Sequence, residues 1–180
     1  DGSITDLPRE DYIKPEERVI NELKELGKPF LVALNSTDPD NPNTRKLAEN
    51  LKVKYGVPVV PVNCLKLDRD DITYILQEIL YEFPVTEMRI KMPEWVDTLD
   101  SGHWLSREYY DVLNQAVEPV QKLRDIDQVV TGLSEANHTR DVMLDELNLG
   151  QGSATITINL EGDLFYDLLE EFTGHSIGGD

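Results

Sequence analysis

Two short, uninterrupted apolar runs constrain the fold of this chain more than any other feature. They occupy residues 29–34 and 57–62, and such runs are typical of strands buried on both faces of a parallel sheet. Stretches with helical spacing lie before, between and after them, at residues 11–27, 43–55 and 70–82. This alternation predicts a doubly wound α/β domain. Two strands are too few for an independent sheet, so we expect further sequence upstream in a longer protein.

The pattern changes at Pro84, where we place a boundary between residues 1–84 and residues 85–180. The second part mixes strand and helix signals, as in a small α+β domain. Pro119 lies inside a helical stretch and should kink or split it. The elements predicted are a half-exposed strand at 85–92, of the kind that pairs in antiparallel sheets, a helical stretch at 105–135, a short helix around Met143, Leu144 and Leu147 ending at Gly150, a half-exposed strand at 154–160 and a helix at 163–172.

The net charge and the single cysteine exclude several kinds of partner and of covalent link. The chain has 17 Lys and Arg against 35 Asp and Glu, a net charge of −18. An acidic surface repels phosphate backbones and anionic lipid, so we expect no nucleic-acid or membrane-surface partner. The single cysteine allows no intrachain disulfide. No apolar run is long enough for a transmembrane segment, and we predict a cytoplasmic protein.

Polar side chains follow both apolar runs, where ligands bind in open α/β sheets. Asn35, Ser36 and Asp38 follow the first run, and Asn63 and Cys64 follow the second. P-loop GTPases place an Asn-Lys-x-Asp motif after the penultimate strand, where the Asp binds guanine, and a Ser-Ala-Lys-type loop after the last strand. Here Ser36 replaces the Lys and Asn63-Cys64 replaces Ser-Ala. We take these five residues as a candidate cofactor-binding site, although Asn and Asp are also ordinary turn residues.

Catalytic machinery is missing from the sequence. It contains no G-x-x-x-x-G-K-[ST] loop to cradle phosphates and no Asp-x-x-Gly switch for Mg²⁺. The three histidines lie far apart, without metal-ligand spacing. Cys64 is interpreted as a small packed residue rather than a nucleophile, and Gly150-Gln151-Gly152 as a turn. We therefore assign no catalytic or metal-binding residue, and expect no bound cofactor and no activity from this chain alone.

Many short blocks of the sequence, in order along the whole chain, resemble the stage IV sporulation protein A family. The blocks are residues 1–12, 16–30, 80–85, 103–105, 123–127 and 149–152. The resemblance implies that residues 1–84 are the C-terminal part of a P-loop ATPase domain, related to translation-factor GTPases but lacking Walker A and B, and that residues 85–180 are an acidic middle domain.

The resemblance also implies a function. Members of that family are morphogenetic ATPases of the spore coat, which use ATP and Mg²⁺. Hydrolysis drives polymerisation with other copies into a basement layer at the outer forespore surface, on the mother-cell side. A small membrane-associated peptide anchors the layer, and other spore coat proteins build on it. Two alternatives remain open: a piece of a translation-factor-like GTPase that reads guanine through Asn35 and Asp38, and a plain protein-interaction module.

Overall fold

The computed structural model describes residues 7–175. The chain divides into two compact units, with the division between Phe83 and Pro84. Each unit has a hydrophobic core of its own.

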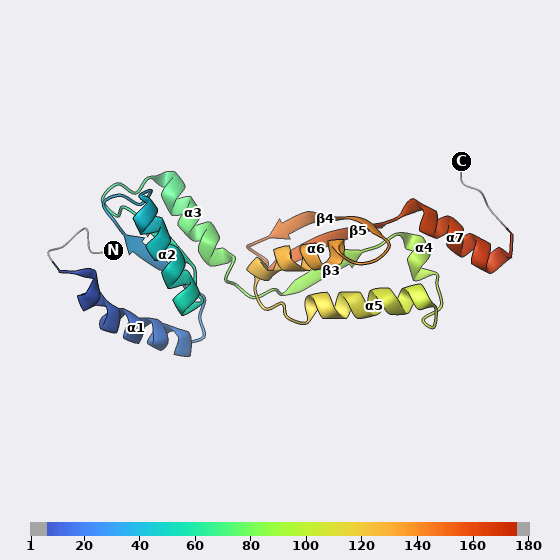
Figure 1. Cartoon of the computed structure of the whole chain (residues 1–180), viewed down its shortest axis with the longest axis horizontal. Coiled ribbons are helices and arrows are strands. Elements are labelled where there is room, and N and C mark those ends of the chain that lie inside the picture. The colour runs from blue at the N-terminus through green and yellow to red at the C-terminus, as the bar shows by residue number, and fades with distance from the viewer. Residues whose placement is uncertain (1–6, 176–180) are drawn as a thin grey trace. The chain divides into compact units, whose positions relative to one another are not determined.

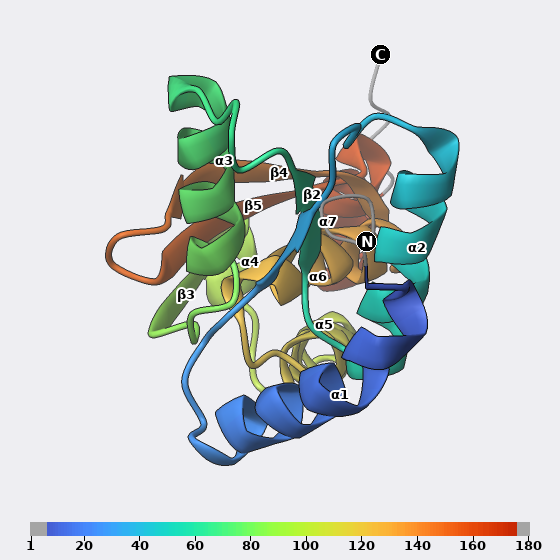
Figure 2. The ribbon, with the colours of Figure 1, turned by 90° about the vertical axis from the view of Figure 1, so that its left-hand side faces the viewer.

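In residues 7–83, the first unit has three helices and a pair of strands. In order along the chain these are α1 (Arg9–Glu25), β1 (Val32–Asn35), α2 (Pro42–Tyr55), β2 (Val59–Val62) and α3 (Arg69–Leu80). The strands pair in parallel, with Val32 opposite Val59 and Asn35 opposite Val62, as the two apolar runs predict. Figure 2 shows α2 and α3 on opposite sides of the two strands.

Local sequence explains where the helices of this unit begin and end. The side chain of Asn41 accepts a hydrogen bond from the N–H of Asn43 at 2.9 Å and so caps α2. The helix ends at Gly56, which adopts the left-handed conformation with φ 62°. At α3, Asp68 and Asp71 form a reciprocal capping box. These caps satisfy N–H groups that a helix terminus otherwise leaves unpaired.

The hydrophobic cluster of the first unit joins its first two helices to the sheet. Ile20 of α1 and Leu51 of α2 are buried there with Leu34 of β1. Helix α3 has no buried residue, and Ile72 and Leu76 are 49% and 56% exposed. These two side chains stay exposed because the described part of this unit offers α3 only a two-stranded sheet to pack against.

The second unit is α+β, with one mixed sheet. Its elements are β3 (Glu87–Lys91), α4 (Glu94–Asp97), α5 (Trp104–Val117), the 3₁₀ turn η1 (Leu123–Asp125), α6 (Ile126–Ser134), β4 (Thr139–Asn148), β5 (Ser153–Leu160) and α7 (Gly162–Thr173). The strand order is β3-β5-β4. Figure 1 shows α5 and α6 on the same side of this sheet, and their apolar side chains meet the alternate residues of β5 that face the core.

The helical stretch predicted at 105–135 is split in two, as Pro119 indicates. Helix α5 ends at Val117, and α6 begins at Ile126 after η1. Proline cannot donate the backbone hydrogen bond that would continue the helix. The break allows α5 and α6 to pack side by side, so that Tyr109 and Val129 both enter the core.

The short helix predicted around Met143 and Leu147 is wrong, because this segment is strand β4. It pairs antiparallel with β5, and its register shifts between Leu144 and Glu146. Val142, Leu144 and Leu147 pack against the core. The bulge inserts one residue between the last two, which breaks the strict alternation and leaves a spacing that resembles a helix.

Strand β3 forms where expected but pairs differently. It lies parallel to β5, with Glu87 opposite Ser153 and Lys91 opposite Thr157, and not in an antiparallel pair. Alternation of apolar and polar residues reports only that one face of a sheet is covered. It does not determine the direction of the neighbouring strand.

Candidate functional site

The parallel pairing of β1 and β2 brings the two predicted loops to one edge of the sheet. Both strands run in the same direction and in register, so residues 36–41 and residues 63–68 leave the sheet at the same end. This is the carboxyl end, where ligands bind in open α/β sheets. All five predicted site residues lie at this end or in the loop that follows it.

Hydrogen bonds tie the two loops together. The N–H of Ser36 donates to the carbonyl oxygen of Val62 at 2.8 Å. The side-chain amide of Asn63 donates to the carbonyl oxygen of Thr37 at 3.1 Å. In the other direction, the N–H of Cys64 donates to the Oδ1 of Asn35 at 3.1 Å. The loops therefore form one connected surface.

Ser36 is a structural residue of this surface. Its side chain is 1% exposed, its Oγ accepts a hydrogen bond from the N–H of Asp38 at 3.2 Å, and it lies 3.3 Å from the Oγ1 of Thr44. A long cationic side chain at this position would point into the loop interior. The absence of lysine at position 36 thus matches a local geometry in which a small hydroxyl shapes the turn. Thr44, which lies in α2, was not anticipated from the sequence.

Asp38 and Cys64 remain accessible after the loops have formed. The Asp38 carboxylate is exposed, and within residues 7–175 no hydrogen bond or ion pair engages it. Cys64 is an exposed free thiol, so the interpretation of Cys64 as a packed residue is wrong. Its position after the buried strand carries it into the loop, beyond the sheet. Leu65, the next residue, is 90% exposed.

The amides of Asn35 and Asn63 face inward, towards the loop backbones. Asn63 uses both of its side-chain atoms, since its Oδ1 also accepts from the N–H of Leu65 at 3.1 Å. The two loops are therefore held together by Asn35, Ser36 and Asn63. Two groups remain accessible, the carboxylate of Asp38 and the thiol of Cys64. A carboxylate in this position can accept hydrogen bonds from a ring or amine N–H of a ligand.

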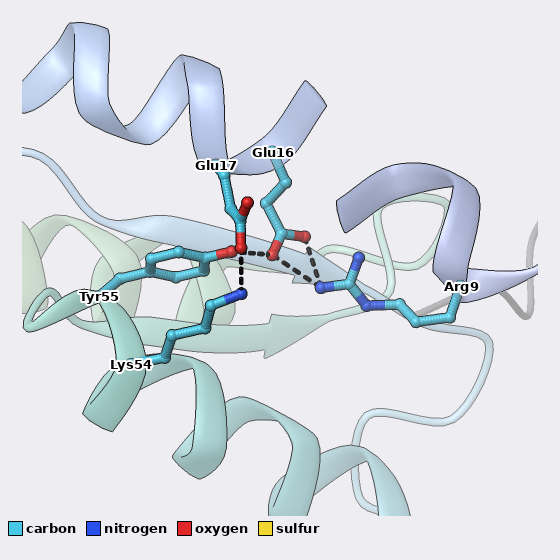
Figure 3. Close-up of polar contacts among 5 residues, drawn as sticks. All are labelled: Arg9, Glu16, Glu17, Lys54 and Tyr55. Carbon is cyan, nitrogen blue, oxygen red and sulfur yellow. Dashed lines mark hydrogen bonds and ion pairs between the residues drawn. The ribbon is translucent and has the colours of Figure 1, made fainter. Parts of the chain in front are cut away.

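A polar network attaches α1 to α2 and was missed from the sequence (Figure 3). Glu16 accepts hydrogen bonds from Arg9 at 2.7 Å and from the Tyr55 hydroxyl at 2.8 Å. Next to it, Lys54 donates to Glu17 at 2.6 Å. Burial raises the pKa of Tyr55, and the hydrogen bond to Glu16 raises it further. The network therefore fixes the C-terminal end of α2 against α1.

Residues in the second unit do not form a comparable site. Of the described residues, no three His, Cys, Asp or Glu side chains are grouped so as to hold a metal ion. The ring of His103 accepts a hydrogen bond from the N–H of Leu105 at 3.2 Å and caps α5. It is packed, with its side chain 9% exposed. No helix in residues 7–175 is both long and apolar enough to cross a membrane.

Comparison with known proteins gives two family matches that follow one another along the chain. Residues 1–84 match the family described as stage IV sporulation protein A, ATPase domain. Residues 85–180 match stage IV sporulation protein A, middle domain. No solved structure matches the chain at a significant level.

Three curated relatives are similar over nearly the whole chain. Stage IV sporulation protein A of Clostridioides difficile is 42% identical over 180 residues, which cover 100% of this chain and 37% of the relative. The proteins of the same name from Bacillus subtilis and Bacillus anthracis are 40% and 38% identical, over 99% of this chain and 36% of each relative. The chain thus spans little more than a third of their length, and it belongs to the stage IV sporulation protein A family.

Proposed function

We propose that the chain is part of a sporulation ATPase that couples ATP hydrolysis to polymerisation in the spore coat. Residues 1–84 supply the base side of a P-loop-type nucleotide site, and residues 85–180 supply a middle domain for assembly. ATP and Mg²⁺ are the cofactors of the intact protein. Its phosphate-binding and metal-binding residues belong to segments other than this chain.

One observation carries the proposal. The loops that contain Asn35 and Cys64 are joined by hydrogen bonds at the carboxyl ends of two parallel strands. They lie in the part of the chain that matches an ATPase domain. The exposed Asp38 carboxylate is the group best suited to meet a nucleotide base, and the second loop presents the exposed Leu65 side chain.

The partners of the intact protein follow from the same proposal. They are other copies of itself, a small membrane-associated anchor peptide and further coat proteins, on the mother-cell side of the forespore. The acidic charge of −18 supports protein partners over nucleic acid. The coupling between nucleotide and polymer requires a two-state element whose equilibrium both sites bias.

The test uses the full-length protein that contains this chain, and measures ATP and GTP hydrolysis together with sedimentation of polymer. We expect ATP turnover and ATP-dependent polymer from the full-length protein. Residues 1–180 alone should give neither above a blank without protein, because phosphate contacts supply most of the affinity for nucleotide. ATP turnover by residues 1–180 would contradict the proposal that the phosphate-binding and metal-binding residues lie in other segments of the protein.

Substitution of Asp38 separates this proposal from its alternatives. Asp38→Ala in the full-length protein should raise KM for ATP by roughly tenfold, as for the loss of one charge-assisted hydrogen bond. The matched control is Asp40→Ala in the same loop, where the carboxylate pairs with Arg45 at 2.7 Å. A guanine preference that Asp38→Ala abolishes would favour the GTPase alternative. Failure of the full-length protein to bind any nucleotide would favour the interaction module.

A further inference from the structure

Strand β3 is an open edge of the sheet in the second unit. Among the residues that the structure describes, the strand order β3-β5-β4 leaves β3 with one neighbouring strand. Its apolar residues Met88 and Ile90 face the core but are only half-buried. Their register partners on the central strand, Ala154 and Ile156, are 2% and 0% exposed. A further strand beside β3 would cover the remaining surface of Met88 and Ile90.

The other edge of this sheet is poorly suited to pairing. Strand β4 has register shifts between Thr139 and Asp141 and between Leu144 and Glu146. Such bulges twist an edge strand and interrupt its row of hydrogen-bonding groups. By contrast, β3 keeps an unbroken register with β5 over Glu87–Lys91. The regular edge is therefore β3.

The backbone of β3 presents hydrogen-bonding groups at regular positions. Just before the strand, the N–H of Thr86 donates to the carbonyl oxygen of Gly152 at 2.8 Å, and the N–H of Glu87 donates inward to the same oxygen at 3.4 Å. The register that pairs Glu87 with Ser153 places the N–H groups of Glu87, Arg89 and Lys91 on the side of β5. Because alternate residues of a strand direct their N–H and C=O groups to opposite sides, those of Met88 and Ile90 point to the open edge. In an antiparallel partner with the same sequence, Met88 meets Ile90 of the second copy, and each such pair exchanges two hydrogen bonds.

The charges of β3 are complementary in that same register. The exposed face of the strand carries Glu87, Arg89 and Lys91. With Arg89 at the two-fold axis, Glu87 lies opposite Lys91 of the second copy, and the pair occurs twice. Opposite charges on directly facing residues stabilise antiparallel strands. The two Arg89 side chains face each other, and each has a carboxylate of its own copy beside it, since Arg89 pairs with Glu87 at 2.7 Å.

We propose that β3 pairs with β3 of a second copy of this chain, antiparallel and centred on Arg89. The two sheets then form one continuous sheet across a two-fold axis. This inference deepens the self-assembly proposed above and rests on it for its biological role. An isologous contact of this kind closes on itself, so a polymer requires a second, different contact elsewhere in the protein.

The test measures the oligomeric state of residues 1–180 by sedimentation velocity over a wide concentration range, without nucleotide. We expect a concentration-dependent dimer. Glu87→Lys and Lys91→Glu should each raise the dimer dissociation constant by roughly tenfold, because each turns two attractive cross-strand pairs into repulsive ones. The double variant Glu87→Lys with Lys91→Glu restores opposite charges and should recover most of the affinity. Arg140→Glu on β4 makes a matched charge reversal away from the contact and should have no such effect.

A proline variant tests whether the dimer depends on backbone hydrogen bonds at the edge of β3. Met88→Pro removes an N–H that points to the open edge, a position where proline is tolerated in a sheet. It should abolish the dimer while the far-UV circular dichroism stays unchanged. If Met88→Pro unfolds the chain, the charge variants of Glu87 and Lys91 still test the pairing of β3. A chain that remains monomeric, or a dimer that neither the single charge variants nor their combination alters, overturns the pairing of β3.

These outcomes are distinct from those of the ATPase test. ATP-driven polymer from the full-length protein, together with monomeric residues 1–180, would remove the β3 contact and leave the proposed function standing. A charge-sensitive dimer of residues 1–180, together with no nucleotide-dependent polymer from the full-length protein, would support the β3 contact and remove the proposed function.

Discussion

The hydroxyl of Tyr55, at the end of α2, donates a 2.8 Å hydrogen bond to the carboxylate of Glu16 on α1. Tyr55 is 6% exposed, so this bond is largely shielded from water. The same carboxylate holds Arg9 at 2.6 Å. One acidic residue thus joins two turns of α1 to the helix that follows the first loop of the candidate site.

Tyr55→Phe should destabilise the first unit by about 1–2 kcal/mol, because it removes a shielded hydrogen bond to a charged acceptor. The expected readout is a lower midpoint of urea unfolding, followed by far-UV circular dichroism. Tyr74→Phe serves as the control, since Tyr74 lies on α3 and is 53% exposed. Equal effects of the two substitutions would show that the contact between Tyr55 and Glu16 contributes nothing specific.

The stability of the second unit should depend on acid pH through Asp145. The Oγ1 of Thr157 donates to this carboxylate at 2.7 Å, and this bond, with help from Lys91, lowers the pKa of Asp145 below its usual 3.8. A carboxyl group with a lowered pKa in the folded state stabilises the fold above its unfolded pKa. That contribution is lost as the pH falls through the folded value.

Thr157→Val keeps the shape of the side chain and removes its donor. We expect the free energy of unfolding of the variant to fall less steeply than that of the wild type as the pH drops below about 4. Thr155→Val, on the same face of the same strand, should retain the slope of the wild type. Identical slopes for Thr157→Val and the wild type would rule out this role for the hydroxyl.

Gly152, in the turn between β4 and β5, should be intolerant of any side chain. Its φ is +72°, and a Cβ there would lie 3.0 Å from the carbonyl oxygen of Pro84. Gly152→Ala should therefore cost at least about 1–2 kcal/mol, from backbone strain and from the close contact.

Gly132→Ala is the matched control for Gly152→Ala. Gly132 lies inside α6 with open space around it, and alanine is the better helix former by up to about 1 kcal/mol. The two substitutions should shift the thermal midpoint in opposite directions. A neutral Gly152→Ala would contradict the conformation described for this turn.

The thiol of Cys64 should react readily in the folded chain. Cys64 is exposed, so Ellman's reagent should label one thiol per chain, at a rate within about tenfold of that in denaturant. A thiol that reacts only after unfolding would show that the second loop packs more closely than the structure indicates.

The sequence by itself determined the features that depend on neighbouring residues. The cap at Asp68, the helix end at Gly56 and the break near Pro119 all follow from side chains or backbone preferences within a few positions. The two apolar runs predicted parallel strands, and the positions of Asn35 and Asn63 directly after them placed both residues where such strands end. Each of these rests on local geometry or on a short-range pattern.

Only the tertiary structure decided the features that depend on distant residues. Whether residues 139–148 form helix or strand depends on pairing with β5, and the bulge near Leu144 hides the alternation that would have predicted it. The direction of β3 depends on which strand becomes its neighbour. Burial of Ser36 and exposure of Cys64 depend on how two loops, far apart in sequence, share hydrogen bonds. Pairing and burial are set by contacts across the whole unit, and no local pattern records them.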